Sequence, residues 1–376
     1  MRRTVLLACP YFPPHIGGVE SYVWNLARQL QRRHGYRVLI ATTADPGTAP
    51  GRCTGPDDIP VYRLRVLARF SNTPFSPTWQ QALRTLIAAH RVDLVNAHAP
   101  VPLFADAAAR ANSHVPFVLT YHTGRMRHGN RLTNALLAAY ERTVLTGTVR
   151  RAQELICCSD YVAADQPRLF ASRATTISPG VDLTCFTPAP LVREPRLLFV
   201  GSLEPATAYK GLDQLLRAVA QLAPDCPVGL TVVGAGSALN HYADLAVTLG
   251  ISDRVEFAGR LEGAELAQAY QRARVLALPT AFESFGSVLA EAMACGRPVV
   301  TTPVGGIPSL VTHRGNGLLV PPGDVDALAS ALGELLRDDV LARRLGQVGH
   351  ARVTADLSWD RQADRTAFVF ERALAQ

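Results

Sequence analysis

The stretch LLFVGSLEPATAYKGLDQLLRAVAQL, residues 197–222, contains the pattern of one strand, one loop and one helix in that order. The short apolar run at 197–200 is typical of a strand buried on both faces. The glycine, serine and proline that follow predict a loop. Apolar residues then recur at helical spacing over 212–222, which predicts a helix with one buried side. A strand followed by a helix is the repeating unit of a parallel α/β sheet.

The same alternation runs through both halves of the chain. We expect strands at 4–8, 37–42, 93–97, 117–120, 155–158, 197–200, 230–233, 255–258, 275–278, 299–301 and 318–320. One helix is expected after the first strand, where apolar residues at 19, 22, 23, 26 and 30 share one helix face. Further helices are expected at 212–222, 264–272, 288–295, 325–336, 340–353 and 360–374. The pattern predicts an α/β protein with parallel sheets and helices on both sheet faces.

A Pro-rich stretch from Ser178 to Pro190 interrupts this alternation and predicts the linker between two domains. We therefore expect a first domain over 1–182 and a second over 183–357. Residues 358–376 are expected to form a last helix that packs back on the first domain.

The composition is that of a folded protein. Of 376 residues, 48% are hydrophobic and 18% are charged, which excludes a disordered chain. No apolar run has membrane-spanning length, and the run at 5–8 is too short for a secretory leader, so we interpret it as a strand. The seven cysteines form no C-x-x-C pair, which favours reduced thiols and a cytoplasmic protein.

The net charge of +7 is spread along the chain, so nucleic acid is not an expected partner. Arg63, Arg65 and Arg69 alternate with apolar residues up to Phe70, a pattern that can contact an anionic membrane at its inner face. The alternation fits a strand with one solvated face equally well, and we favour that interpretation. Peripheral membrane contact and the oligomeric state are left open.

Lys210 is the only lysine among 38 basic residues. It lies after a strand and just before a helix, where a compact ammonium can neutralise a diphosphate group. A solvated surface lysine is the alternative. Because every other basic residue is an arginine, we favour a function for this one.

Two carboxylates flank the start of the helix expected at 288–295. Glu283 precedes the helix and Glu291 lies near its middle, with Val288 on the buried face. The Gly286 and Ser287 amides would point out of the helix N-terminus, where a phosphate is favoured. Carboxylates can accept hydrogen bonds from sugar or ribose hydroxyls. Ordinary surface carboxylates fit these two positions about as well.

Two glycine turns follow strands. Gly17 and Gly18 precede a helix and can offer bare amides to an anion, although a simple turn is favoured on this signal alone. Gly234 and Gly236 imitate a dinucleotide fingerprint, but Leu239 takes the third glycine position. We interpret the second pair as a turn that lets a ligand or helix come close.

Tyr121, His122 and Arg125 lie at the end of the strand expected at 117–120, where open α/β sheets bind ligands. His122 can hydrogen-bond a sugar or carry a proton, and Arg125 can contact a charged acceptor. A solvated basic loop is the alternative. His98 has a similar position, and for it a packed core residue is favoured.

In their order and spacing, these motifs resemble the retaining glycosyltransferases of family 4, which have the two-domain GT-B fold. The motifs are Gly17-Gly18-Val19-Glu20, Pro179-Gly180-Val181-Asp182, Val200-Gly201-Ser202-Leu203 with Lys210-Gly211, Val255 to Gly259, Glu283 with Glu291, Gly305-Gly306, and Asn316 to Val320 with Asp324. The resemblance covers nearly the whole chain. It implies two Rossmann-like domains that face each other across a cleft.

The resemblance also implies roles. Gly18, with Gly17, and the amides of Gly286, Ser287 and Val288 would bind the donor phosphates. Lys210 would bind the diphosphate, Glu283 the transferred sugar and Glu291 the ribose. Backbone at Arg260 and Leu261 would contact the nucleobase, and His122 would face the sugar. Ser202 stands where the family usually has an arginine, which leaves one diphosphate contact in doubt.

The expected function is transfer of a hexose from a nucleotide diphosphate sugar, with UDP favoured over GDP, to a small-molecule, lipid or glycan acceptor. Catalytic residues would be His122, Lys210 and Glu283, and retention is implied by the family alone. No Asp-x-Asp motif lies in a suitable loop, so neither a metal nor another cofactor is expected. A nucleotide-sugar epimerase and a non-catalytic nucleotide-sugar binder are the alternatives.

Overall fold

The computed structural model describes residues 2–15, 17–70, 73–111, 114–126, 131–170, 173–222 and 228–376. It divides into two compact units. Unit 1 comprises Met1–Gly180 with Trp359–Gln376, and unit 2 comprises Val181–Ser358. The chain therefore leaves the first unit after Gly180, where the sequence analysis placed the boundary after residue 182.

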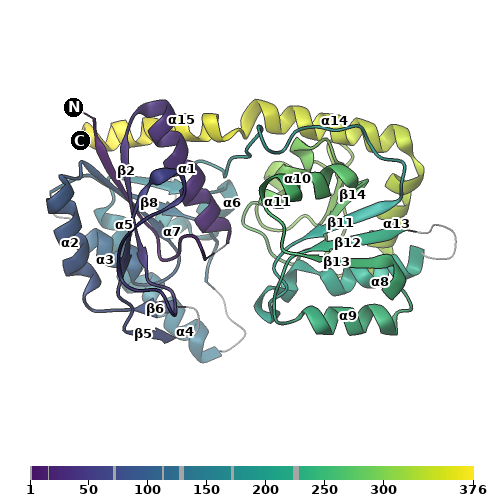
Figure 1. Ribbon diagram of the computed structural model, residues 1–376, viewed down its shortest axis with the longest axis horizontal. Coiled ribbons are helices and arrows are strands. Elements are labelled where there is room, and N and C mark those ends of the chain that lie inside the picture. The colour runs from purple at the N-terminus through teal and green to yellow at the C-terminus, as the bar shows by residue number, and fades with distance from the viewer. Residues whose placement is uncertain are drawn as a thin grey trace. The chain divides into compact units, whose positions relative to one another are not determined.

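Unit 1 contains an eight-stranded sheet in the order β10-β9-β8-β7-β1-β2-β4-β3 (Figure 1). Every pair in it is parallel except β3 with β4. Its strands are β1 (Thr4–Ala8), β2 (Arg37–Thr43), β3 (Gly51–Thr54), β4 (Pro60–Leu64), β7 (Leu94–Ala99), β8 (Phe117–Tyr121), β9 (Glu154–Cys157) and β10 (Ala174–Thr176). A separate hairpin pairs β5 (Ala68–Phe70) with β6 (Thr73–Phe75).

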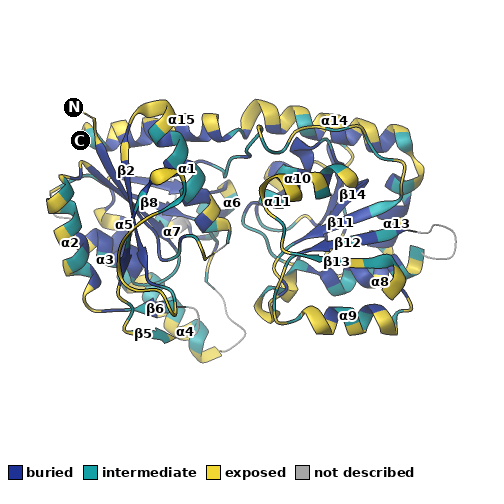
Figure 2. Cartoon of the chain, in the orientation of Figure 1, coloured by how far each residue is buried: buried dark blue, intermediate teal, exposed yellow. Residues whose placement is uncertain are grey.

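The helices of unit 1 are α1 (Gly18–His34), α2 (Trp79–His90), α3 (Phe104–Ala111), α4 (Arg131–Tyr140), α5 (Thr146–Arg151), α6 (Asp160–Asp165), α7 (Pro167–Phe170) and α15 (Trp359–Leu374). A π-helical turn, Glu141–Leu145, joins α4 to α5, and a 3₁₀ turn covers Pro56–Asp58. Strand β1 is buried along its whole length, as a central parallel strand between helices must be (Figure 2). Helix α1 ends where Gly35 takes the left-handed conformation.

Unit 2 contains a six-stranded parallel sheet in the order β13-β12-β11-β14-β15-β16. Its strands are β11 (Arg196–Val200), β12 (Gly229–Val233), β13 (Val255–Gly259), β14 (Val275–Leu278), β15 (Val299–Thr301) and β16 (Leu318–Leu319). Its helices are α8 (Leu212–Leu222), α9 (Leu239–Thr248), α10 (Gly263–Arg272), α11 (Ser287–Ala294), α12 (Ile307–Leu310), α13 (Val325–Arg337) and α14 (Asp339–Asp356), with 3₁₀ turns at Pro205–Lys210 and Ser252–Arg254. This strand order is that of a Rossmann fold.

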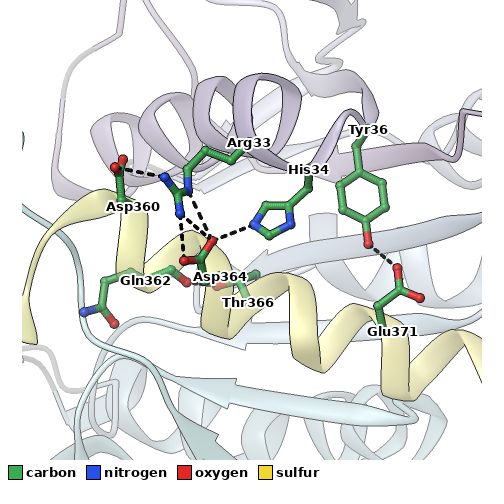
Figure 3. Close-up of polar contacts among 8 residues, drawn as sticks. All are labelled: Arg33, His34, Tyr36, Asp360, Gln362, Asp364, Thr366 and Glu371. Atoms are coloured by element: carbon green, nitrogen blue, oxygen red, sulfur yellow. Dashed lines mark hydrogen bonds and ion pairs between the residues drawn. The ribbon is translucent and has the colours of Figure 1, made fainter.

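The predicted return of the last helix to the first domain is confirmed, because α15 belongs to unit 1. Its buried face includes Trp359, Ala363, Ala367 and Phe370, which join the apolar cluster of α1 and β1. At its exposed edge, Arg33 and His34 of α1 both contact Asp364 at 2.9 Å, as Figure 3 shows. The apolar face accounts for most of the docking energy, since exposed ion pairs contribute little.

One local prediction is wrong, and one helix was not predicted. Residues 63–70 do not form one strand with a solvated arginine face, because β4 ends at Leu64 and β5 starts a separate hairpin. Arg63 is buried, donates to the Pro13 carbonyl and lies 3.6 Å from Asp45. Partners distant in sequence decide this burial, so the alternation could not reveal it. Helix α9 was not expected, because only Tyr242 and Ala246 on it are buried.

Candidate functional site

The two central strands of the unit 2 sheet, β11 and β14, mark the point where strand order reverses. Open α/β sheets bind ligands at this point, outside the carboxyl ends of the strands. Lys210 lies in the connection that follows β11, and Glu283 lies in the connection that follows β14. The chain topology therefore brings together two residues that lie 73 positions apart.

Lys210 and Glu283 form a partly buried ion pair. Lys210 Nζ lies 3.3 Å from Glu283 Oε2, and the two side chains are 19% and 18% exposed. The stem of the lysine passes over Gly201, where an added Cβ would come within 3.0 Å of Lys210 Cδ. The only lysine of the chain is thus held at the mouth of the sheet and does not extend into solvent.

Glycines let the loops around this pair come close. Gly211 has a φ of +79°, and a Cβ there would lie 2.2 Å from the Pro279 carbonyl oxygen. The Tyr209 carbonyl accepts the Ala281 amide at 2.7 Å, which joins the two loops directly. Gly305 likewise allows a close approach to Glu283, because a Cβ on Gly305 would lie 1.9 Å from the Glu283 carbonyl oxygen. The same carbonyl accepts the Gly306 amide at 2.9 Å. The backbone that carries both charged groups is fixed from either side.

Helix α11 begins beside Glu283. Gly286 is its N-cap, in the left-handed conformation with a φ of +95°. The Leu289 and Ala290 amides donate to the Gly286 carbonyl, whereas the Ser287 and Val288 amides have no acceptor within the described part of the chain. Two free amides at the positive end of the helix, near the Lys210 ammonium, make this region favourable for an anion.

Glu291 lies further along α11 and accepts the Tyr270 hydroxyl of α10 at 2.7 Å. Burial raises the pKa of the Glu291 carboxyl from its usual 4.5 to about 7, and the Tyr270 hydrogen bond opposes that rise. The sequence does not predict a role for Tyr270 in the site. The only signal for it is a tyrosine on the buried face of a helix, which is ordinarily a core residue.

The remaining predicted donor residues of unit 2 lie at the same carboxyl edge of the sheet. Ser202 is exposed, and its hydroxyl accepts the Glu204 amide at 3.3 Å. Arg260 is exposed and donates to Glu262, while Leu261 packs against the core. The Gly234–Gly236 turn needs correction: an added Cβ on Gly234 would lie 1.8 Å from the Gly201 carbonyl oxygen. Within the protein, the close neighbour of this turn is therefore the 201–204 loop and not a helix.

The Gly17–Gly18 turn of unit 1 has an acidic neighbour. Gly17 is the N-cap of α1, and a Cβ there would lie 2.5 Å from Glu20 Oε2. The buried Glu20 carboxylate also contacts His15 Nδ1 at 2.7 Å, and this hydrogen bond raises the pKa of His15. A carboxylate of the helix itself therefore lies beside this turn. Gly18 is open, since nothing lies within 4 Å of a Cβ built on it.

Of the three predicted acceptor-side residues, Tyr121 needs correction. Its side chain is fully buried, packs on Phe170 and accepts a hydrogen bond from Gln166, so it offers no surface to an acceptor. Arg125 is exposed and anchored to Asp165.

His122 follows β8 and is partly buried. Burial lowers the pKa of its imidazole to about 3. It is neutral at physiological pH, and its Nε2 lies 2.9 Å from Nδ1 of His98.

Comparison with known proteins shows to which family the chain belongs. Residues 16–184 match the family model described as Glycosyltransferase Family 4, and residues 194–338 match Glycosyl transferases group 1. A D-inositol 3-phosphate glycosyltransferase of Mycobacteroides abscessus is 32% identical over 96% of this chain and 85% of the relative. A glycogen synthase of Mycobacterium tuberculosis is 29% identical over 98% of this chain and 94% of the relative. The chain belongs to glycosyltransferase family 4.

Solved structures show the same fold for this glycosyltransferase. Sucrose-phosphate synthase from Thermosynechococcus elongatus superposes with a TM-score of 0.81 at 24% identity, with full coverage of both chains. Anabaena HepE, solved in complex with UDP, superposes with a TM-score of 0.77 at 22% identity, covering 98% of this chain and 99% of HepE. The fold is therefore GT-B. Membership of family 4, shown by the family models and the relatives, makes the protein a hexosyltransferase. Within the described residues, no helix is both long and apolar enough to cross a bilayer.

Proposed function

We propose that this glycosyltransferase moves a hexose from a nucleoside diphosphate sugar to an acceptor hydroxyl, with retention of configuration and without a metal ion. The observation that carries the proposal is the Lys210–Glu283 pair at the switch point of the unit 2 sheet, 3.3 Å apart. The free Ser287 and Val288 amides at the start of α11 complete an anion site on the same edge.

Loss of the sugar leaves negative charge on the diphosphate, which the Lys210 ammonium and the α11 amides would stabilise. Donor binding would separate the ion pair: Lys210 would turn to phosphate oxygens, and Glu283 would accept hydrogen bonds from hydroxyls of the transferred sugar. Glu291, oriented by Tyr270, would accept hydrogen bonds from the ribose hydroxyls. Gly17 and Gly18, the backbone at Arg260 and Leu261, His122 and Arg125 complete the proposed set. Retention follows from the family resemblance.

UDP is the favoured base and GDP the second choice. HepE structures contain UDP, UDP with glucose, or UDP-glucose, which supports the first. A Mycobacterium tuberculosis relative, 30% identical, is named a GDP-mannose-dependent mannosyltransferase acting on phosphatidylinositol monomannoside, which supports the second. The names of the relatives include inositol phosphate, lipid and glycan acceptors, and we propose an acceptor from these classes. We place the enzyme in the cytoplasm, with access to the inner membrane face for a lipid acceptor.

A donor-binding and transfer assay tests the proposal. Thermal shifts with UDP, GDP and their sugars identify the base, and a labelled sugar reports transfer with and without EDTA. Lys210→Ala and Glu283→Gln should each lower kcat/KM for the donor by about 100-fold or more. Glu194→Gln is the matched control, because this exposed glutamate lies before β11, at the opposite edge of the sheet.

Three results would contradict the proposal: undiminished transfer in both site variants, loss of transfer on EDTA treatment, or an inverted product. Rearranged or released sugar in the absence of any acceptor would instead indicate an epimerase. Binding of the nucleotide sugar with no turnover across inositol, lipid and glycan acceptors would indicate a non-catalytic binder.

A further inference from the structure

His98 is a buried polar residue that the proposed transfer leaves without a role. It lies in β7, and its side chain is fully buried. In the parallel register of β7 with β8, His98 pairs with Thr120, two residues before His122. The His122 amide donates to the Ala99 carbonyl at 3.0 Å, which continues this pairing beyond the end of β8. Strand register therefore places the two imidazoles side by side.

The two rings form one hydrogen-bonded unit. His98 Nδ1 lies 2.9 Å from His122 Nε2, and the ring planes are only 16° apart. Tyr22 of α1 packs edge-on against both rings, at 4.7 Å from His122 and 5.8 Å from His98. The Cys158 thiol donates to the His122 carbonyl. His122 is thus held through its backbone, through one ring face and through one ring nitrogen.

The shared hydrogen bond contains a single proton, and the surroundings of His98 decide which ring donates it. Burial lowers the pKa of both imidazoles, so each ring is neutral and carries one N–H. His98 Nε2 is buried and has no hydrogen-bond partner in the described part of the chain. A buried N–H without an acceptor is rarer in folded proteins than a buried acceptor without a full set of donors. The proton of His98 therefore belongs on Nδ1, and Nδ1–H donates to His122 Nε2.

This assignment also fixes which ring nitrogen of His122 carries its proton. Because His122 Nε2 accepts, the single proton of that ring is on Nδ1. His122 as a residue is only partly buried, and no hydrogen bond of its Nδ1 is found within the described residues. His122 therefore presents an N–H donor, and not a bare nitrogen, beyond the carboxyl end of β8.

We propose that His98 is a positioning residue of this glycosyltransferase: its Nδ1–H bond to His122 Nε2 fixes the orientation and tautomer of His122, so that His122 Nδ1–H donates to an oxygen of the bound substrate. The inference rests on the proposed function for the role of His122. It assigns His122 as a hydrogen-bond donor to substrate and excludes it as a general base in the resting enzyme.

Nitrogen NMR on the full-length enzyme, labelled with ¹⁵N-histidine, tests the tautomer directly. His122 is assigned by comparison with His122→Gln. The wild-type spectrum should show His122 protonated at Nδ1 and unprotonated at Nε2. A proton on His122 Nε2 overturns the proposal. This measurement needs no substrate, so its result stands even if the wild-type enzyme transfers no sugar, which would be the failure of the proposed function.

Kinetics of two substitutions test the positioning role. His98→Leu fills the space but removes the donor, and should lower kcat by about 10- to 100-fold with a much smaller change in the donor KM. His98→Asn restores an N–H near the Nδ1 position and should recover most of that loss. Asn96→Ala is the stability control, since Asn96 lies in the same strand and its buried amide donates to Val118 and Thr120.

Full activity in His98→Leu overturns the proposal, as does a His98→Asn variant no better than His98→Leu. So does Asn96→Ala with the same fall in kcat, because the loss would then reflect a weakened sheet. Should His98→Leu not fold, the wild-type nitrogen spectrum still decides the tautomer.

Discussion

Tyr270 donates its hydroxyl to Glu291 across 2.7 Å and thereby ties helix α10 to the middle of helix α11. The Glu291 carboxyl is buried away from water, and this burial raises its pKa to about 7. Burial also raises the pKa of the neighbouring Cys295 thiol to about 12 and that of Tyr270 well above 10, so both neighbours stay neutral. Glu291 therefore titrates near physiological pH.

Glu291 should make stability and donor binding respond oppositely to pH. A carboxyl whose folded pKa exceeds its unfolded value stabilises the fold at low pH, and this contribution is lost as pH rises from about 4.5 to about 7. Glu291→Gln removes the cost of the buried charge and should raise the free energy of unfolding above pH 7 by up to about 3 kcal/mol. Below about pH 4.5 the two proteins should converge. Denaturant unfolding at several pH values measures the difference.

In the proposed site, the charged form of Glu291 holds the donor ribose. The donor KM of the wild type should therefore rise as pH falls from 8 to 6. Glu291→Gln should have a higher KM that is flat over this range. A wild-type KM that does not change with pH would contradict the ribose assignment.

Gly211 should not tolerate a side chain. Alanine would have to adopt a φ near +79° and would place its Cβ 2.2 Å from the Pro279 carbonyl oxygen. Gly211→Ala should lower the free energy of unfolding by more than about 3 kcal/mol and displace Lys210 from Glu283. Gly250→Ala is the control, since Gly250 has a φ of +68° but no atom within 4 Å of a built Cβ. Its cost should be about 1–2 kcal/mol with activity retained. Equal costs in the two variants would show that the close contact is unimportant.

Lys210 should not be replaceable by arginine, although arginine serves at every other basic position. Its stem lies against Gly201 and its ammonium contacts Glu283. An arginine side chain ends in a larger, planar guanidinium, which cannot take the place of the compact ammonium at this position. Lys210→Arg should lower kcat/KM for the donor by about 10-fold or more, with an unchanged melting temperature. Near-wild-type transfer by the arginine variant would show that charge alone suffices at this position.

The docking of α15 on unit 1 should depend on its apolar face. Phe370 is fully buried among residues of α1 and β1, and Phe370→Ala should destabilise unit 1 by about 3–5 kcal/mol. Asp364→Asn removes the exposed contacts to Arg33 and His34 seen in Figure 3 and should cost less than about 1 kcal/mol. Hydrogen exchange of α1 and α15 amides measures both effects. A larger loss of stability in Asp364→Asn than in Phe370→Ala would show that the polar contacts, and not the apolar face, hold α15 in place.

Local pattern alone determined the α/β class, most strand positions, the break between the two domains and the presence of a last helix, because strand burial and helix periodicity are encoded in short windows of residues. Tertiary packing decided that this helix belongs to the first unit. Local pattern also marked Lys210 by its rarity, Glu283 by its position before one helix, and Glu291 by its position on that helix. It could not determine that Tyr121 is enclosed by the core or that Glu20 folds back on Gly17, since both depend on packing.

Only the tertiary structure decided the pairings within the site. Lys210 meets Glu283 across 73 residues, His98 meets His122 across 24, and Tyr270 meets Glu291 across 21. For the first two pairs, the order and register of parallel strands set which carboxyl ends are neighbours. For the third, the packing of α10 on α11 sets which side chains meet. Strand order and helix packing follow from the burial of the whole sheet and not from any single window of sequence.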